Sequence, residues 1–246
     1  MMLPIFEIGT FIEQALFLSP AHIYSFLFSL TLIILLYRFR NHTFINKYSR
    51  VILISILVLT EISLIIWSVS VNQWDLRYNL PLQLCTISLY LCLFMLITKN
   101  FFVFEVVYFF GMAGALQALI TPDLFYTFPH FRFLHFFIAH IAIILSILYM
   151  VWVEKFSVTF SSIFKSMLVL NGIAFIAFWT NKITGANYMF LSRKPNNPSM
   201  LDLLGPYPWY ILSLEFIALF MFVLLYLPFL LKRTSKTNEK RKRRRH

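Results

Sequence analysis

Charged residues are scarce in this sequence: only 13% of its 246 residues are Asp, Glu, Lys or Arg. A soluble domain carries about 25% charged residues, because it needs a polar surface. Here 60% of the residues are hydrophobic, and they gather in blocks long enough to cross about 30 Å of hydrocarbon. The scarcity of charge therefore argues against an ordinary soluble enzyme and predicts an integral membrane protein.

Cysteine and the common catalytic motifs are also nearly absent. The two cysteines, Cys85 and Cys92, lie seven residues apart in one predicted helix, which is about 10 Å and too far for a disulfide. Gly-rich phosphate loops, Cys-x-x-Cys pairs and His-Glu-x-x-His motifs are missing. His135 and His140 do not share a helical face, because they are five residues apart. We therefore predict no metal site and no cofactor.

The positive charge is concentrated at one end of the chain. The formal net charge is +11, but nine of the 21 Lys and Arg lie in residues 232–246. A basic run directly after an apolar helix is typical of a segment that meets anionic lipid headgroups. We predict a disordered basic tail over 232–246 and no nucleic-acid partner.

The apolar blocks predict an all-α, polytopic bundle of about seven transmembrane helices. Residues 1–20 are expected to form an interfacial amphipathic segment, helical over 3–18, and residues 21–231 the transmembrane domain. The amino terminus lacks the basic start and cleavage site of a signal peptide, so the first span is expected to direct insertion. The predicted spans are 21–38, 51–70, 80–98, 101–120, 133–153, 161–180 and 209–231.

Basic residues are divided unequally between the two sides that seven spans define. Sixteen, including those of the tail, fall on one side and five on the other. Because the cytoplasmic side is enriched in Lys and Arg, we predict an amino terminus outside, a cytoplasmic carboxyl terminus and a place in the cell membrane.

Several polar residues fall inside the predicted spans, where they are costly and usually face the bundle interior. By residue count, Cys85, His140 and Glu215 lie about 7–11 Å below the outer interface, which makes this layer the best candidate for a site. Each has a plainer interpretation: a small core cysteine, or a side chain that bonds a neighbouring helix. Further candidates are His135, Gln83, Gln117 and Glu61 in the spans, and Asn187, Arg193 and Lys194 in the long connection 181–208.

A set of motifs resembles the YwaF-like integral membrane proteins of Gram-positive bacteria. This family is related to an animal transmembrane acyltransferase family that builds arachidonoyl ether phospholipids with a cysteine nucleophile. Here Gln83 stands where the animal pattern has His, so the substrate does not carry over. The motifs are Leu80–Cys85, Gly111–Leu119, Thr121–Asp123, Phe128–His130, His135 with His140, Gly185–Met189, Arg193–Pro195 and Leu203–Tyr210.

The resemblance implies a Cys85 nucleophile with His140, or else His135, as its base. The expected function is phospholipid acyl transfer, or lipid acyl hydrolysis, near the outer leaflet, with a phospholipid or lysophospholipid as partner. We expect Glu215 to orient the histidine, and Gln117 or Asn187 to stabilise an oxyanion. Arg193 and Lys194 would bind a phosphate.

Two classes without catalysis stay open. A small-molecule transporter or ligand-binding bundle would use Glu61, Glu215 and the histidines as a polar path. A structural membrane protein would need neither Cys85 nor His140.

Overall fold

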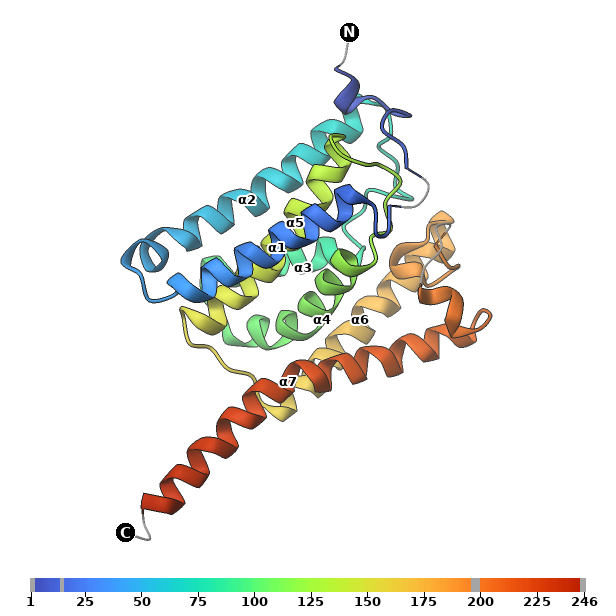
Figure 1. Cartoon of the computed structure of the whole chain (residues 1–246). Helices are drawn as coiled ribbons and strands as arrows, with labels where there is room; N and C mark the ends of the chain where they lie inside the picture. The colour runs from blue at the N-terminus through green and yellow to red at the C-terminus, as the bar shows by residue number, and fades with distance from the viewer. Residues whose placement is uncertain (1–2, 14–15, 196–199, 244–246) are drawn as a thin grey trace.

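The computed structural model describes residues 3–13, 16–195 and 200–243, and over these residues the protein is all-α (Figure 1). Short 3-10 helices lie at Pro4–Phe6, Tyr188–Phe190 and Met200–Leu204, and the described part contains no strand beyond a single bridge between Ile12 and Tyr126. The α-helices are α1 (Pro20–Phe39), α2 (Thr43–Ser70), α3 (Leu84–Thr98), α4 (Phe101–Ile120), α5 (Phe131–Trp152), α6 (Phe160–Thr184) and α7 (Trp209–Arg243).

The predicted bundle of seven helices is confirmed, with one short member. Six described helices are long and apolar enough to cross a membrane, whereas α3 has 15 residues. At 1.5 Å per residue α3 is about 22 Å long, less than the roughly 30 Å of hydrocarbon. The third span was predicted from residue 80, but Leu80–Gln83 form a turn and Gln83 is the N-cap.

Helices α4 and α5 occupy the centre of the bundle. Helix α4 packs against α3, α5, α6 and α7, and α5 packs against α1, α2, α3 and α4. In both, 61% of the span is buried, compared with 17% in α1 and 11% in α7. The apolar outer faces of α1 and α7 are therefore available to lipid, as expected for helices at the edge of a membrane bundle.

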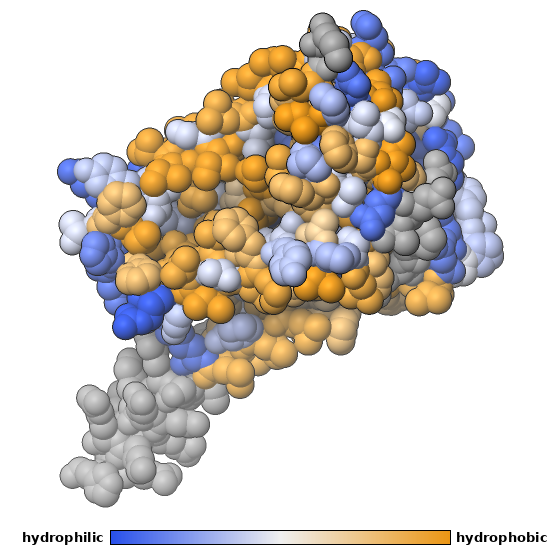
Figure 2. All heavy atoms as spheres, turned by 45° about the horizontal axis from the view of Figure 1, so that its top comes forward, coloured by the Kyte–Doolittle hydropathy of each residue, from blue (hydrophilic) through white to orange (hydrophobic). Residues whose placement is uncertain are grey.

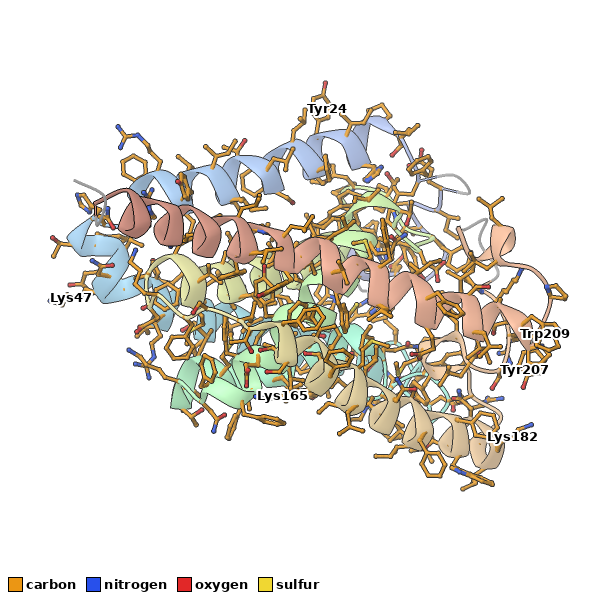
Figure 3. All side chains as sticks on the ribbon, turned by 90° about the horizontal axis from the view of Figure 1, so that it is seen from below. Tyr24, Lys47, Lys165, Lys182, Tyr207 and Trp209 are labelled. Atoms are coloured by element: carbon orange, nitrogen blue, oxygen red, sulfur yellow. The ribbon has the colours of Figure 1, made fainter. Side chains whose placement is uncertain are left out.

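On the face that Figure 2 shows, polar residues gather towards the two ends of the molecule, and hydrophobic residues cover most of the surface between them. We call one end the basic end; it holds the connections 40–42, 99–100 and 153–159, and Lys47 marks it in Figure 3. The long-loop end holds the connections 71–83 and 121–130 and the described parts of 185–208, and Lys182 and Trp209 mark it in Figure 3.

Two segments differ from the prediction. Residues 3–18 do not form a helix in their described part, which holds one 3-10 turn and the bridge to Tyr126. Gly9 at φ 86° and Phe11 at φ 50° lie in the left-handed region, which ends helical structure there. The tail, predicted to be disordered, continues α7 to Arg243, because Lys, Arg and Glu favour a helix that has already been nucleated. Residues 244–246 lie outside the described residues.

Candidate functional site

Cys85 lies in the first turn of α3, on the face that packs into the bundle. Leu89, Cys92 and Leu96 are four, seven and eleven residues further on, so they share its side of the helix. All three are buried, with Cys92 fully so, and Cys85 is partly buried. The thiol side of Cys85 therefore faces the neighbouring helices and not lipid.

Three helices meet at Gly111 on α4. A Cβ atom at this position would lie 3.5 Å from the Cβ of Ser88 on α3 and 3.3 Å from the Cδ1 of Ile147 on α5. Both α3 and α5 begin at the long-loop end. Cys85 is three residues closer to that end than Ser88, and His140 is seven residues closer to it than Ile147. If Ser88 and Ile147 are at the same height, His140 lies about 6 Å closer to the long-loop end than Cys85, at 1.5 Å per residue.

A second contact gives the opposite offset. The Sγ of Cys92 lies 3.9 Å from the carbonyl oxygen of Ile143 on α5. Cys85 is seven residues closer to the long-loop end than Cys92, and His140 is three residues closer to it than Ile143. If Cys92 and Ile143 are at the same height, Cys85 lies about 6 Å closer to the long-loop end than His140. The two contacts give offsets of about 6 Å in opposite directions, so they limit the difference in height between Cys85 and His140 to about 6 Å along the bundle.

The imidazole of His140 has one nitrogen engaged and one available. Its Nδ1 lies 2.7 Å from the carbonyl oxygen of Phe136. Because a carbonyl oxygen only accepts, Nδ1 carries the hydrogen, and Nε2 of the neutral ring holds a lone pair. This is the form that a general base requires. No hydrogen bond or electrostatic contact joins His140 to Cys85 in the described part of the chain.

His135 faces a different helix. It contacts the backbone of Thr60 on α2, and its Nε2 is buried without a hydrogen-bond partner among the described residues. Nearby on α2, Glu61 accepts a 2.7 Å hydrogen bond from the Tyr90 hydroxyl of α3. His135 and Glu61 therefore belong to the seams that α2 forms with α5 and α3.

Glu215 and Gln117 have hydrogen-bond partners other than His140. Glu215 on α7 accepts a 3.1 Å hydrogen bond from the amide of Asn171 on α6. Gln117 is exposed and donates to Thr121. The predicted orienting role of Glu215 thus has no supporting contact. Glu61 and Glu215 lie in separate seams, so these contacts do not favour a single polar path for transport.

Hydrogen bonds join the segment after α6, at Tyr188 and Met189, to the turn before α3. Gln83 accepts a 3.1 Å bond from the backbone N–H of Met189. The buried Tyr188 hydroxyl donates to the carbonyl of Leu76 and accepts from the N–H of Leu80. Leu80 and Tyr188 belong to two of the motifs that carry the family resemblance, but no local pattern predicts that they meet across more than 100 residues.

Asn181 of α6 holds Tyr188 in place by two hydrogen bonds. Its side chain accepts from the N–H of Tyr188 at 2.8 Å and donates to the carbonyl of the same residue at 3.0 Å. These contacts of Asn181, Tyr188 and Gln83, which we call the clasp, fix the turn that precedes α3, in which Cys85 is the second residue.

The remaining loop candidates have structural contacts. Asn187 accepts from the N–H groups of Ser192 and Arg193 and donates to the Arg193 carbonyl, so both of its polar side-chain atoms are engaged. Lys194 lies over the Tyr210 ring and contacts the carbonyl of Asp202. These contacts hold the loop together; the oxyanion and phosphate roles of Asn187, Arg193 and Lys194 remain predictions.

A buried carboxylate at the basic end has its own partners. Glu105 on α4 accepts from Ser162 at 2.5 Å and forms a 2.7 Å salt bridge with Lys165, both on α6. Ser162, Lys165 and Ser166 follow a spacing of three and four, a stripe that could have indicated this partner. At the same end, Lys99 forms a 2.7 Å salt bridge with Glu154. The described residues contain no cluster of three or more metal-ligating side chains.

The sequence of this chain matches one known protein family. The model of the TMEM164 family matches residues 17–226, most of the chain. The chain belongs to the TMEM164 family. No curated protein and no solved structure matches it.

The TMEM164 family match covers α1 to α6 and the first half of α7. It includes Cys85, His140 and the clasp around Tyr188, and it ends before the basic tail. With the apolar helices, the TMEM164 family match identifies a multi-pass membrane protein whose surroundings are a lipid bilayer.

Proposed function

We propose that this protein is a cysteine-dependent phospholipid acyltransferase, or a lipid acyl hydrolase if water is the acceptor. The observation that supports this function most is that Cys85 and His140 lie on α3 and α5, which pack together, and within about 6 Å of each other in height. The motif resemblance around Cys85 supports the same chemistry. A thiol and an imidazole with a lone pair are the groups that covalent acyl transfer requires.

In the first half-reaction, the thiol proton passes to Nε2 of His140 and the sulfur attacks the ester carbonyl of a phospholipid. A C–S bond forms and the ester C–O bond breaks. The leaving lysophospholipid oxygen takes the proton back from the imidazolium. The acyl group is then held on Cys85 as a thioester.

In the second half-reaction, the acceptor hydroxyl of a lysophospholipid gives its proton to Nε2 and attacks the thioester. A new C–O bond forms, the C–S bond breaks, and the thiolate of Cys85 recovers the proton. With water as acceptor the same steps release a free fatty acid. No metal, oxidant or cofactor enters this balance.

The test compares the two cysteines in purified protein given a labelled phospholipid donor and a lysophospholipid acceptor. We expect wild type and Cys92→Ala to transfer the acyl chain, because Cys92 packs against Ile143 below the proposed site. Cys85→Ala should transfer none. If Cys85→Ala transfers as well as Cys92→Ala, the proposed function is wrong.

An intact-mass measurement provides a second, independent readout. Wild type incubated with donor alone should gain the mass of one acyl chain, and neutral hydroxylamine should remove it as expected for a thioester. Omission of the acceptor distinguishes transfer from hydrolysis, because only a hydrolase releases free fatty acid under that condition.

We also propose that the long-loop end faces outside the cell membrane and the basic end faces the cytoplasm. The unequal distribution of Lys and Arg supports this orientation. It places Cys85, in the first turn of α3 at the long-loop end, in the outer half of the bilayer.

A further inference from the structure

A hydrogen-bonded pair of polar side chains is accessible at the surface where α6 meets α7. The two helices lie side by side at one edge of the bundle, and both pack on α4 (Figure 1). The side-chain amide of Asn171 on α6 donates a 3.1 Å hydrogen bond to Oε2 of Glu215 on α7. Asn171 is exposed and Glu215 is only partly buried.

The pair lies at a depth where lipid offers no polar partner. Asn171 is about 17 Å from the start of α6 and about 20 Å from its end, at 1.5 Å per residue. Half of a hydrocarbon core is about 15 Å, so Asn171 lies near the bilayer midplane, and the hydrogen bond places Glu215 beside it. Polar groups at this depth are costly and pair with other polar groups.

Apolar side chains surround the pair on the same two helix faces. Residues three before and four after a given residue share its side of a helix. Around Asn171 and Glu215 these positions are all exposed and apolar, which leaves a lipid-facing surface with a polar centre. We call this surface the α6–α7 face, and it consists of Leu168, Asn171 and Phe175 of α6 and Leu212, Glu215 and Leu219 of α7.

The pair has one hydrogen-bond donor and one acceptor left over. Both N–H groups of the Asn171 amide are used, one on Glu215 and one on the carbonyl of Met167. Among the described residues, Oδ1 of Asn171 and Oε1 of Glu215 have no hydrogen-bond partner. Because an unpaired carboxylate is too costly in hydrocarbon, the Glu215 carboxyl group carries its proton, and its Oε1–H is a donor.

We propose that the α6–α7 face is the interface of a homodimer, in which two copies of this chain meet about a twofold axis along the membrane normal. Oε1–H of Glu215 in each copy donates to Oδ1 of Asn171 in the other, so the leftover donor and acceptor of both copies are satisfied. A twofold interface requires a self-complementary surface, and one donor beside one acceptor at the same height is such a surface. The acyl chains of a lipid carry neither group, which selects a second copy of the chain as the occupant.

The first test measures association in lipid vesicles by energy transfer between full-length chains that carry a donor or an acceptor dye at the carboxyl terminus. Over a series of protein-to-lipid ratios, wild type should follow a monomer–dimer curve. Asn171→Leu/Glu215→Leu should associate about 30-fold more weakly, because two interhelical hydrogen bonds are lost. Glu215→Gln keeps a donor N–H and should associate as wild type. Thr31→Val, which removes an exposed hydroxyl from α1, is the control and should also do so.

The second test locates the interface by disulfide cross-linking in membranes, in the background Cys85→Ser/Cys92→Ser. Phe175 and Leu212 each lie about one turn from the pair towards the long-loop end, so they are at similar heights on α6 and α7. Chains with Phe175→Cys should therefore cross-link to co-expressed chains with Leu212→Cys when an oxidant is added. Leu59 of α2 is as exposed as Phe175, at 65%, so Leu59→Cys with Leu212→Cys is the control and should not cross-link.

Three results would overturn the proposal. They are a wild type that stays monomeric at every protein-to-lipid ratio, a folded Asn171→Leu/Glu215→Leu variant that associates as tightly as wild type, or equal cross-linking of the two cysteine pairs. Thermal melting shows whether the double variant is folded, and Glu215→Leu alone tests the same bonds if it is not. The homodimer is independent of the proposed acyl transfer, which uses Cys85 on α3.

Discussion

The buried histidines differ in what their two ring nitrogens do. In His22, Nδ1 accepts from the Leu18 N–H and Nε2 bonds the Leu119 carbonyl. In His130, Nδ1 accepts from the Arg132 N–H and Nε2 bonds the carbonyl of Glu7. With both nitrogens engaged, these rings stabilise helix starts and loops. His140 uses only Nδ1, so its Nε2, like that of His135 among the described residues, is left to accept a proton.

Replacement of His140 by Gln should lower acyl transfer by about 10²–10⁴-fold, because the proton acceptor is lost. His135→Gln is the matched control on the same helix and should retain most activity if His140 is the base. Both variants are assayed with the same donor and acceptor, and thermal melting shows that they are folded. A larger loss in His135→Gln than in His140→Gln would reverse the assignment.

His130 predicts a pH dependence of stability. The ring is fully buried at the N-cap of α5, and burial lowers the pKa of His130 below its ordinary value of 6.5. The folded state therefore binds fewer protons than the unfolded chain, and His130 makes stability decline as pH falls below about 6.5. Protonation would also break the acceptor bond from Arg132, since Nδ1 would then carry a hydrogen.

The measurement compares melting temperatures in detergent at pH 7.5 and pH 5.5. Wild type should lose more stability between these values than His130→Asn, which keeps an N-cap acceptor but does not titrate. Equal losses in the two proteins would assign the pH dependence to other groups.

Close contact of α3, α4 and α5 depends on the missing side chain at Gly111. Gly111→Val should destabilise the protein by about 1–3 kcal/mol, because its side chain overlaps Val107, Ile147 and Ser88. Gly172 on α6 has no heavy atom within 4 Å of an added Cβ, so Gly172→Val is the matched control with little effect. Thermal unfolding in detergent compares them; equal stability of both variants would show that α3 and α5 need no close approach at α4.

Helix positions could be predicted from the sequence where hydropathy alone decides them. Helix α4 covers the predicted residues 101–120, because Asn100 caps it and an apolar run fills it. Helix α2 begins eight residues before the predicted 51, since its first two turns are polar and extend beyond the apolar run. The predicted start of α3, residue 80, was wrong because the Tyr188 hydroxyl accepts from the Leu80 N–H and holds that residue in a turn. This contact spans more than 100 residues of sequence.

The candidate site was only partly accessible to sequence reasoning. The number of residues from the start of a helix predicts how deep a side chain lies in the membrane. It does not predict which helix faces pack against each other. Glu215 illustrates the difference: its neighbour is Asn171 on α6, because α7 packs against α4 and α6. Pairing of faces is a property of the whole bundle, and only the contacts around Gly111 and Ile143 relate Cys85 to His140.

The orientation of the whole molecule can be tested at its two ends. In a background of Cys85→Ser and Cys92→Ser, we introduce Lys47→Cys at the basic end or Lys182→Cys at the long-loop end, both exposed and at opposite ends in Figure 3. A membrane-impermeant maleimide added to intact cells should label only Lys182→Cys, since the cytoplasmic side is enriched in Lys and Arg. Disruption of the cells should expose Lys47→Cys to the same reagent. Labelling of Lys47→Cys in intact cells would invert the orientation and move Cys85 to the cytoplasmic leaflet, while the seven-helix bundle and the pairing of α3 with α5 would be unchanged.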